Sequence, residues 1–423
     1  MRTLWQAIAT FSLLLVCGCP SIVPDPENPP GFSNTSDSTN GGARYIGSTA
    51  CRLCHADISA QQALHGHAQT LSGIRGEAPA FPGTSAGVPD PPAGFAWSDI
   101  SYVIGGYVRS AYFLDGQGYL LTTGLTSAAT QWNPKFGANG TNAGFAPYLP
   151  DATAPTPFTF DCIRCHVTGA IARDADNPRS QDNRQGIEGT WVEAGVQCEA
   201  CHGPGSNHFR TVAGRVVIDR TRIFVDATGT DTCAKCHGSA DAAERAVIRA
   251  RDGFIEHYEQ DSELRVSGGH SSFKCTICHD PHRSTAYDRA VAIRNECTSC
   301  HTTATPAGHA GKVLRIGDYV EPVTCVSCHM PFAGKLGTSA ATTFAGAFGR
   351  VGDVRSHIFR INTATADFRS FFSADGSQVQ LDAQGKAAYT VDFICLRCHN
   401  GVGTFPLTPA RAAEIAPNVH RLP

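Results

Sequence analysis

The chain has 423 residues, a formal charge of −3 and only 17% charged residues. This near-neutral balance, without a basic run, excludes a nucleic-acid-binding surface of the usual kind. Gly (43) and Pro (25) are plentiful, which favours loops over long regular elements.

The N-terminus is typical of an exported protein. Residues 1–18 form a signal peptide in which Arg2 precedes an apolar run that is too short to span a bilayer. The sequence ending at Cys19 is similar to a bacterial lipobox, so we expect lipidation of Cys19; ordinary signal cleavage further on is the alternative. Residues 19–44 then form a flexible, lipid-anchored linker. The expected location is the periplasmic side or the outer surface of a bacterium.

A five-residue pattern, Cys-x-x-Cys-His, occurs eight times and uses 16 of the 18 Cys. Two thiols at this spacing can form thioethers to the two vinyl groups of a haem, and the adjacent His then binds its iron. A lone Cys-x-x-Cys could be a redox or zinc motif, but eight copies followed by His predict an octahaem c-type cytochrome with eight haem c groups. The copies, numbered one to eight along the chain, are Cys51, Cys54, His55; Cys162, Cys165, His166; Cys198, Cys201, His202; Cys233, Cys236, His237; Cys275, Cys278, His279; Cys297, Cys300, His301; Cys325, Cys328, His329; and Cys395, Cys398, His399.

The motifs divide the chain into segments. Residues 45–75 form the first haem segment, in which 57–71 have helical composition. Residues 76–157 contain neither Cys nor His and form a haem-free insertion. Within it, a stretch dense in β-branched and aromatic residues is interrupted by Asp115-Gly116, which predicts a β-hairpin, and so a small β-element in 95–125.

Six motifs crowd into a haem-dense core at 158–335, and residues 336–423 form a C-terminal segment with the eighth. In the core, 241–260 read as an amphipathic helix and 286–296 as a short one. The expected fold is mainly α plus irregular coil, organised around a chain of eight covalently bound haems.

Nine further His are available for the eight distal iron positions. Three residues span at most about 10–11 Å, so His282 cannot complete the haem of His279 and must reach a neighbouring haem. The same is expected of His208 after His202. Met330 is the only Met after the leader, so at most one haem has Met ligation. The candidates for these positions are His65, His67, His208, His257, His270, His282, His309, His357 and His420, and either His65 or His67 could be the surplus ninth.

Three segments carry a family resemblance: Tyr45 to Cys51 followed by His67-Ala68, Gly195 to His208, and Cys325 to Pro331. They resemble the multihaem cytochromes related to hydroxylamine oxidoreductase and its tetrahaem cytochrome partner. The resemblance implies closely packed haem pairs, and electron transfer or reduction of small nitrogen or sulfur oxyanions. It also favours His67 over His65 as the distal ligand.

We therefore expect an electron-transfer wire between membrane or periplasmic donors and a terminal reductase or extracellular acceptor. Its partners would be other redox proteins, such as cytochromes, quinol-linked donors and reductases, and the membrane through the lipid anchor. The alternative is an oxidoreductase acting on small nitrogen or sulfur oxyanions at a distally open haem, expected near the first haem and residues 72–157. A third hypothesis, a conductive filament, is disfavoured by the lipobox.

Overall fold

The computed structural model describes residues 34–83, 85, 87–134, 143–239, 241–305, 307–316, 319–336, 352–401 and 405–420. The signal peptide, Cys19 and part of the linker lie outside these residues. In the described part of the chain, no helix has the length and apolar character needed to cross a membrane.

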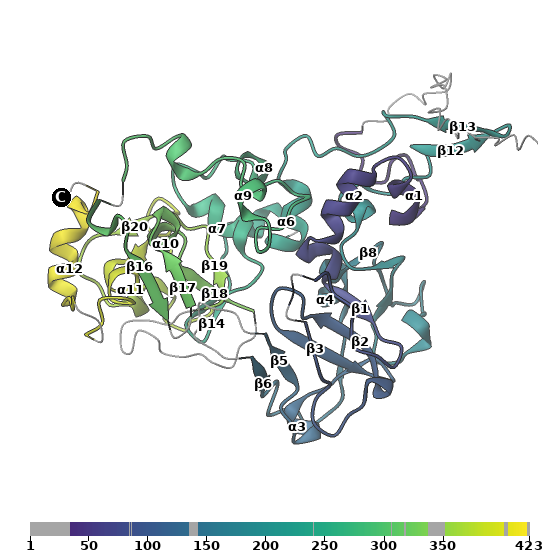
Figure 1. Ribbon diagram of the computed structural model, residues 1–423, viewed down its shortest axis with the longest axis horizontal. Coiled ribbons are helices and arrows are strands. Elements are labelled where there is room, and N and C mark those ends of the chain that lie inside the picture. The colour runs from purple at the N-terminus through teal and green to yellow at the C-terminus, as the bar shows by residue number, and fades with distance from the viewer. Residues whose placement is uncertain are drawn as a thin grey trace, which may run out of the picture.

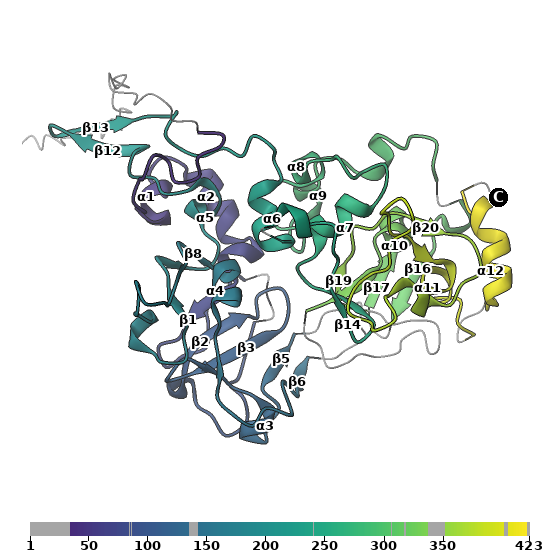
Figure 2. The ribbon, with the colours of Figure 1, turned by 180° about the vertical axis from the view of Figure 1, so that it is seen from behind.

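The molecule has two lobes joined by short helices (Figures 1 and 2). A sheet-rich lobe is built mainly from residues 71–157. It connects through α6 (Asp231–His237), α8 (Cys275–Cys278) and α9 (Arg289–Ala292) to a second lobe that ends with α12 (Pro409–Ile415).

The sheet-rich lobe contains seven strands in which every pairing is antiparallel. The strands are β1 (Leu71–Gly73), β2 (Ile100–Gly105), β3 (Ala111–Asp115), β4 (Tyr119–Leu120), β5 (Gln131–Asn133), β6 (Gly144–Ala146) and β7 (Thr156–Pro157). Their path runs β1-β2-β3-β4-β7, with β5 pairing both β3 and β6. The turn from β3 to β4 uses Gly118 at φ +87°, where a Cβ would come within 2.6 Å of Ile187, so a glycine is required.

Both faces of this sheet are covered, which explains why β2 is apolar almost throughout. On one face Tyr102, Ile104 and Leu114 pack against Ile163, which lies inside the second Cys-x-x-Cys-His motif on α4 (Phe160–His166). On the other face Val103 and Phe113 form a second cluster. The sheet therefore supports the second motif directly.

The second lobe is built on a four-stranded sheet of β14 (Ala250–Arg251), β15 (Phe254–Glu256), β18 (Phe332–Lys335) and β19 (Val354–Arg355), in that order. Its core includes Ile255, Ile358, Phe371, Tyr389 and Phe393. The helices α7 (Gln260–Val266) and α11 (Val391–Cys395) contribute to this core, and α11 also packs on α12.

Short elements complete the fold. They are α1 (Ser48–Arg52), α2 (Ala56–Ala63), α3 (Thr123–Thr126), α5 (Cys198–His202) and α10 (Cys325–His329), and the strand pairs β8 (Val167–Thr168) with β11 (Glu193–Ala194), β9 (Ile171–Ala172) with β10 (Gly189–Thr190), β12 (Phe209–Val212) with β13 (Arg215–Ile218), β16 (Val313–Ile316) with β17 (Tyr319–Pro322), and β20 (Ile361–Asn362) with β21 (Tyr389–Thr390).

The expectation of a mainly helical fold needs correction, because short helices are mixed with a substantial amount of sheet. The hairpin expected around Asp115-Gly116 is present, but the β-element of 95–125 is part of the larger seven-stranded sheet. The prediction of a helix over 241–260 is wrong. There the chain forms a β14–β15 hairpin, since Asp252 (φ 56°) and Gly253 (φ 80°) make a left-handed turn that an α-helix cannot contain.

Candidate haem centres

Each Cys-x-x-Cys-His motif begins on, or lies within, a short helical turn. The turns are α1, α4, α5, α6, α8, the 3₁₀ turn Cys297–Ser299, α10 and α11. In the first motif the His55 N–H donates to the Cys51 carbonyl at 2.9 Å, and His279, His301 and His399 repeat this bond in their own motifs. A helical turn places residues i, i+3 and i+4 on one side. Both thiols and the imidazole can therefore reach one flat ligand.

Seven of the eight motif imidazoles face a second imidazole at nearly constant distance. Their ring centroids lie 5.7–6.4 Å apart. Two imidazoles on opposite sides of one metal ion have ring centres roughly 6 Å apart, given metal–nitrogen bonds of about 2 Å. The pairs therefore fit a haem iron between them. They are His55 with His208 (6.4 Å), His202 with His282 (6.2 Å), His237 with His67 (5.8 Å), His279 with His357 (6.0 Å), His301 with His270 (5.7 Å), His329 with His420 (5.9 Å) and His399 with His309 (6.1 Å).

Six of these fourteen rings, and the ring of His166 in the second motif, are fixed through Nδ1. The His329 Nδ1 lies 2.7 Å from the Phe359 carbonyl oxygen, and the His208 Nδ1 lies 2.8 Å from that of Asp219. A carbonyl oxygen only accepts, so Nδ1 carries the proton and Nε2 keeps its lone pair for a metal. The same contact is made by His166, His202, His399 and His420 to Thr70, Phe224, Phe405 and Thr305, and His237 uses the Gln260 side-chain oxygen.

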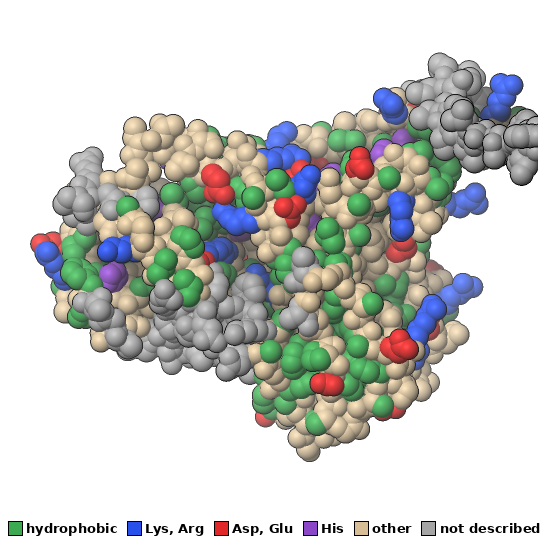
Figure 3. All heavy atoms as spheres, viewed as in Figure 1, with side chains coloured by type: hydrophobic (Ala, Val, Ile, Leu, Met, Phe, Trp, Pro, Cys, Tyr) green, Lys and Arg blue, Asp and Glu red, His purple; other side chains and the backbone are tan. Residues whose placement is uncertain are grey.

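Burial keeps several of these imidazoles neutral, which is the form that binds metal. It lowers the pKa of His67 well below its ordinary value, and the neighbouring His65 and His237 lower it further. Burial likewise lowers the pKa of His257 to about 3, with a smaller contribution from His166. In Figure 3 only small areas of His surface are visible on the face shown.

The second motif differs from the other seven. His257 is close enough to His166 to affect its pKa, but among the described residues these two rings do not form the close pair seen at the other motifs. Two tyrosines lie near this motif: the rings of Tyr112 and Tyr148 are 4.6 Å apart, and Tyr148 is influenced by the Cys162 thiol. Burial raises the pKa of both phenols, that of Tyr148 to about 12, while Arg251 opposes the shift.

Thiols of different motifs meet and so order the motifs in space. The side chains of Cys51 and Cys198 lie side by side, as do those of Cys165 and Cys236 and those of Cys233 and Cys275. Weaker electrostatic contacts join Cys201 to Cys236, Cys278 to Cys300, Cys297 to Cys325 and Cys328 to Cys398. In space the motifs therefore follow one another in the order first, third, fourth, fifth, sixth, seventh and eighth. The second motif lies beside the fourth, as a branch.

Glu199, a buried residue that holds the first and third motifs together, was not predicted from the sequence. Its carboxylate accepts hydrogen bonds from the backbone N–H groups of Ile46, Gly47 and Gly205 at 2.7–3.0 Å. Glu199 occupies the first of the two positions that the Cys-x-x-Cys-His pattern leaves unspecified, so the motif itself does not indicate a role for it. The sequence also gave no sign that Tyr112 and Tyr148 approach the second motif.

Comparisons with known proteins agree with this arrangement. The family model "Cytochrome c554 and c-prime" matches residues 151–203. The chain is 21% identical over 44% of its length to the dissimilatory sulfite reductase MccA of Wolinella succinogenes, and 22% identical over 48% to the multiheme cytochrome MtrA of Shewanella baltica. The matches span 29% and 55% of those two proteins.

Among solved structures, the octaheme sulfite reductase MccA of Wolinella succinogenes has a similar fold. The TM-score is 0.52 at 17% identity, over 84% of this chain and 65% of that one. Together with the eight attachment motifs and the paired imidazoles, these findings identify the chain as a multihaem c-type cytochrome.

Proposed function

We propose that this chain holds eight haem c groups and conducts electrons along them. The observation that carries the proposal is the set of seven imidazole pairs at the spacing of one iron. When bound, each haem supplies one-electron chemistry at its iron. The protein supplies the thioether links, the axial imidazoles and the spacing between centres.

The axial ligands of this proposal follow from the pairs. The motif His of each centre is the proximal ligand. The pairs supply seven distal ligands, for the first centre and then the third to the eighth: His208, His282, His67, His357, His270, His420 and His309. His257 belongs to no pair but lies near His166, and it is proposed for the second centre. The order of neighbouring thiols supports a route from the first centre to the third, fourth and on to the eighth. Cys54 and Cys398, in the two end motifs, are exposed, as are Cys162, Cys201 and Cys300 of three inner motifs, so partners can reach the route at its ends and along its length.

We further propose that the mature protein is exported, held to a membrane through a lipid on Cys19, and exchanges electrons with other redox proteins. A signal-like leader and a polar linker support this. The covalent haem attachment suits an exported protein, because it prevents cofactor loss.

The test of the wire is to quantify haem by pyridine haemochrome and to record low-temperature EPR spectra of the oxidised protein. Eight haems per chain, with at least seven of them low-spin, are expected. Fewer than eight covalent haems would contradict the stoichiometry. High-spin signals from several centres would contradict the assigned imidazole pairs.

The second candidate is a reductase acting on a small sulfur or nitrogen oxyanion at the second centre. It is favoured by the looser approach of His257 to His166 and by the two protonated phenols and Arg251 nearby, because an oxyanion needs proton donors and a cation. The fold similarity to a sulfite reductase agrees with it. This centre lies against residues 72–157 through Ile163.

The two candidates are separated by one EPR experiment. A single high-spin haem that shifts on addition of sulfite, nitrite or hydroxylamine would support the reductase. Eight low-spin haems whose EPR signals do not change on addition of these ions would exclude the reductase and support electron transfer as the function. The His257→Ala variant is the positive control, since it should open the second centre.

A further inference from the structure

His65 is the one His of the chain that the proposed haem centres leave without a partner iron. It lies two residues before His67, and its ring stacks on that of His67 with centroids 4.3 Å apart and planes 26° from parallel. This is too close for a metal ion and its two bonds to stand between the rings. The ring of His67 faces His237 on its other side.

The hydrogen bonds of His65 fix its tautomer. The backbone N–H of His67 donates to the His65 Nδ1 at 3.0 Å, so Nδ1 is the acceptor and the proton lies on Nε2. The Arg283 backbone gives the ring a second, looser polar contact. With Nδ1 occupied and Nε2 protonated, His65 has no lone pair to offer an iron. This is the reverse of the tautomer at the paired rings whose Nδ1 donates to an oxygen, such as His237 and His329.

His65 lies near ligands of two proposed haem centres, the third and the fourth. His67 faces His237 of the fourth motif, and Arg283 directly follows His282, which faces His202 of the third motif. The side chains of His237, His282 and Asp280 also lie near His65. Its ring therefore lies between the distal side of the fourth centre and the loop that carries the distal His of the third.

We propose that His65 is a positioning residue that sets the orientation of the His67 imidazole and holds it against the loop carrying His282. The ring would thereby fix the relative placement of the third and fourth centres, at the point where the second centre branches from the route. The inference rests on the haem assignment proposed above.

The test compares three variants of the full holoprotein. His65→Phe keeps a flat ring but removes the acceptor for the His67 N–H. His65→Asn supplies a side-chain oxygen at a similar distance from the backbone and should restore that bond. Leu64→Ala is the matched control, since the neighbouring Leu64 side chain is 48% exposed.

The readouts are haem content, the low-spin EPR spectrum and a potentiometric titration. All three variants should keep the haem content of the parent. His65→Phe should change the g-values of one low-spin haem and shift the midpoint potential of one or two haems, His65→Asn should return these values toward the parent, and Leu64→Ala should change neither.

Two results would overturn the inference. A new high-spin haem in His65→Phe, with none in His67→Ala, would make His65 the iron ligand. Spectra and potentials of His65→Phe identical to those of the parent would leave His65 without a positioning role. Neither result resembles failure of the haem assignment itself, which would show in the parent protein as missing haems or missing low-spin signals.

Discussion

The imidazole rings of His329 and His420 face each other with centroids 5.9 Å apart and planes 9° from parallel. One lies at the end of a Cys-x-x-Cys-His motif and the other close to the C-terminus. Their Nδ1 atoms contact the carbonyl oxygens of Phe359 and Thr305, respectively. Four segments, around residues 305, 329, 359 and 420, thus hold two Nε2 atoms in position for one iron.

This pair gives a direct test of distal ligation. His420→Ala should retain all covalent haem, because the thioethers are untouched, but one low-spin haem should become high-spin. His420→Met should instead remain low-spin and raise the potential of one haem, since His/Met ligation has a higher potential than bis-His ligation. EPR and potentiometry measure both effects. The exposed neighbour Asn418, changed to Ala, is the control; an unchanged spin state in His420→Ala would contradict the pair.

Gln260 should tune the potential of the fourth centre. Its side-chain oxygen accepts from the His237 Nδ1 at 2.8 Å, and its amide nitrogen donates to the His257 carbonyl at 2.7 Å. Gln260→Glu should lower one midpoint potential, because a carboxylate makes the ligand more basic, and Gln260→Leu should raise it. The exposed Gln384, changed to Leu, should have no effect. Shifts of the same sign in both Gln260 variants would contradict this role.

Tyr148 tests the reductase candidate. Burial raises its pKa to about 12, so the phenol stays protonated at neutral pH and can donate a proton near the second centre. For an oxyanion reductase, Tyr148→Phe should lower kcat roughly 100-fold while reduction of the haems by dithionite proceeds at the parent rate. Tyr119→Phe, in β4 of the large sheet, is the control. Equal turnover in the parent and Tyr148→Phe would exclude the phenol as the donor.

Ile163 connects the large sheet to the second motif. Its side chain is fully buried against Tyr102, Ile104 and Leu114. Ile163→Ala should lower the free energy of unfolding by about 2–5 kcal/mol, through lost burial and the cavity that remains. Guanidinium unfolding of the holoprotein measures the loss. Val192→Ala, at a site 48% exposed, should change it by less than about 0.5 kcal/mol, and a loss at Ile163 of that small size would contradict the packing argument.

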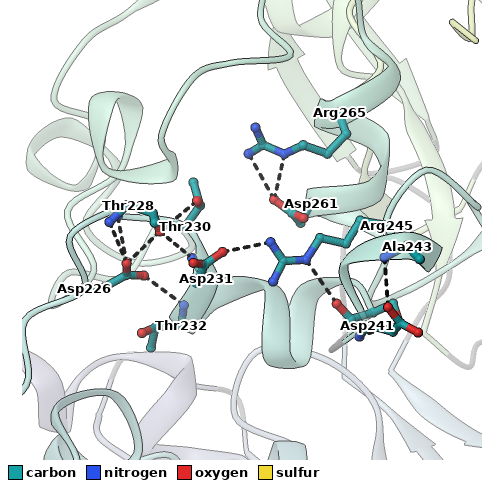
Figure 4. A network of polar contacts seen from close by, with 12 residues as sticks. Asp226, Thr228, Thr230, Asp231, Thr232, Asp241, Ala243, Arg245, Asp261 and Arg265 are labelled. Atoms are coloured by element: carbon teal, nitrogen blue, oxygen red, sulfur yellow. Dashed lines mark hydrogen bonds and ion pairs between the residues drawn. The ribbon is translucent and has the colours of Figure 1, made fainter. Parts of the chain in front are cut away.

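Asp226 should make the fourth motif sensitive to acid. Its carboxylate accepts from the backbone N–H of Thr232, in the first turn of α6, at 2.9 Å (Figure 4). Burial alone would raise its pKa, but the hydrogen bonds from Thr228, Thr232 and Gly229 outweigh this and lower it. Because the folded-state pKa is depressed, the stabilisation is present above the ordinary carboxyl pKa near 4 and is lost as the pH falls through the folded-state value.

Thermal unfolding of Asp226→Ala should accordingly show a loss of about 1 kcal/mol at neutral pH, as for a removed helix cap. The difference from the parent should shrink as the pH falls below 4. Asp90→Ala is the control, since Asp90 is exposed in a loop and its removal should give no such pH-dependent loss. A difference that persists unchanged at low pH would show that the carboxylate charge is not involved.

The sequence by itself determined the chemistry of this protein. The spacing of Cys and His within five residues is a local property, because one helical turn brings thiols and imidazole to the same side wherever the motif occurs. Chain length also decided that His282 cannot face His279, and in the structure it faces His202. The hairpin at Asp115-Gly116 was predictable for the same reason, since a turn depends on neighbouring residues.

Only the tertiary structure decided which imidazoles face each other. His208 and His55, or His309 and His399, come together through the packing of segments far apart in the chain, and no local pattern encodes that meeting. The region 241–260 also shows that local pattern alone can mislead. The spacing of its apolar residues suits a helix, but β15 forms a strand because it pairs with Gly334 and Lys335 of β18. The distinction between His65 and His67 likewise depends on which ring nitrogen accepts a hydrogen bond, which composition and spacing leave open.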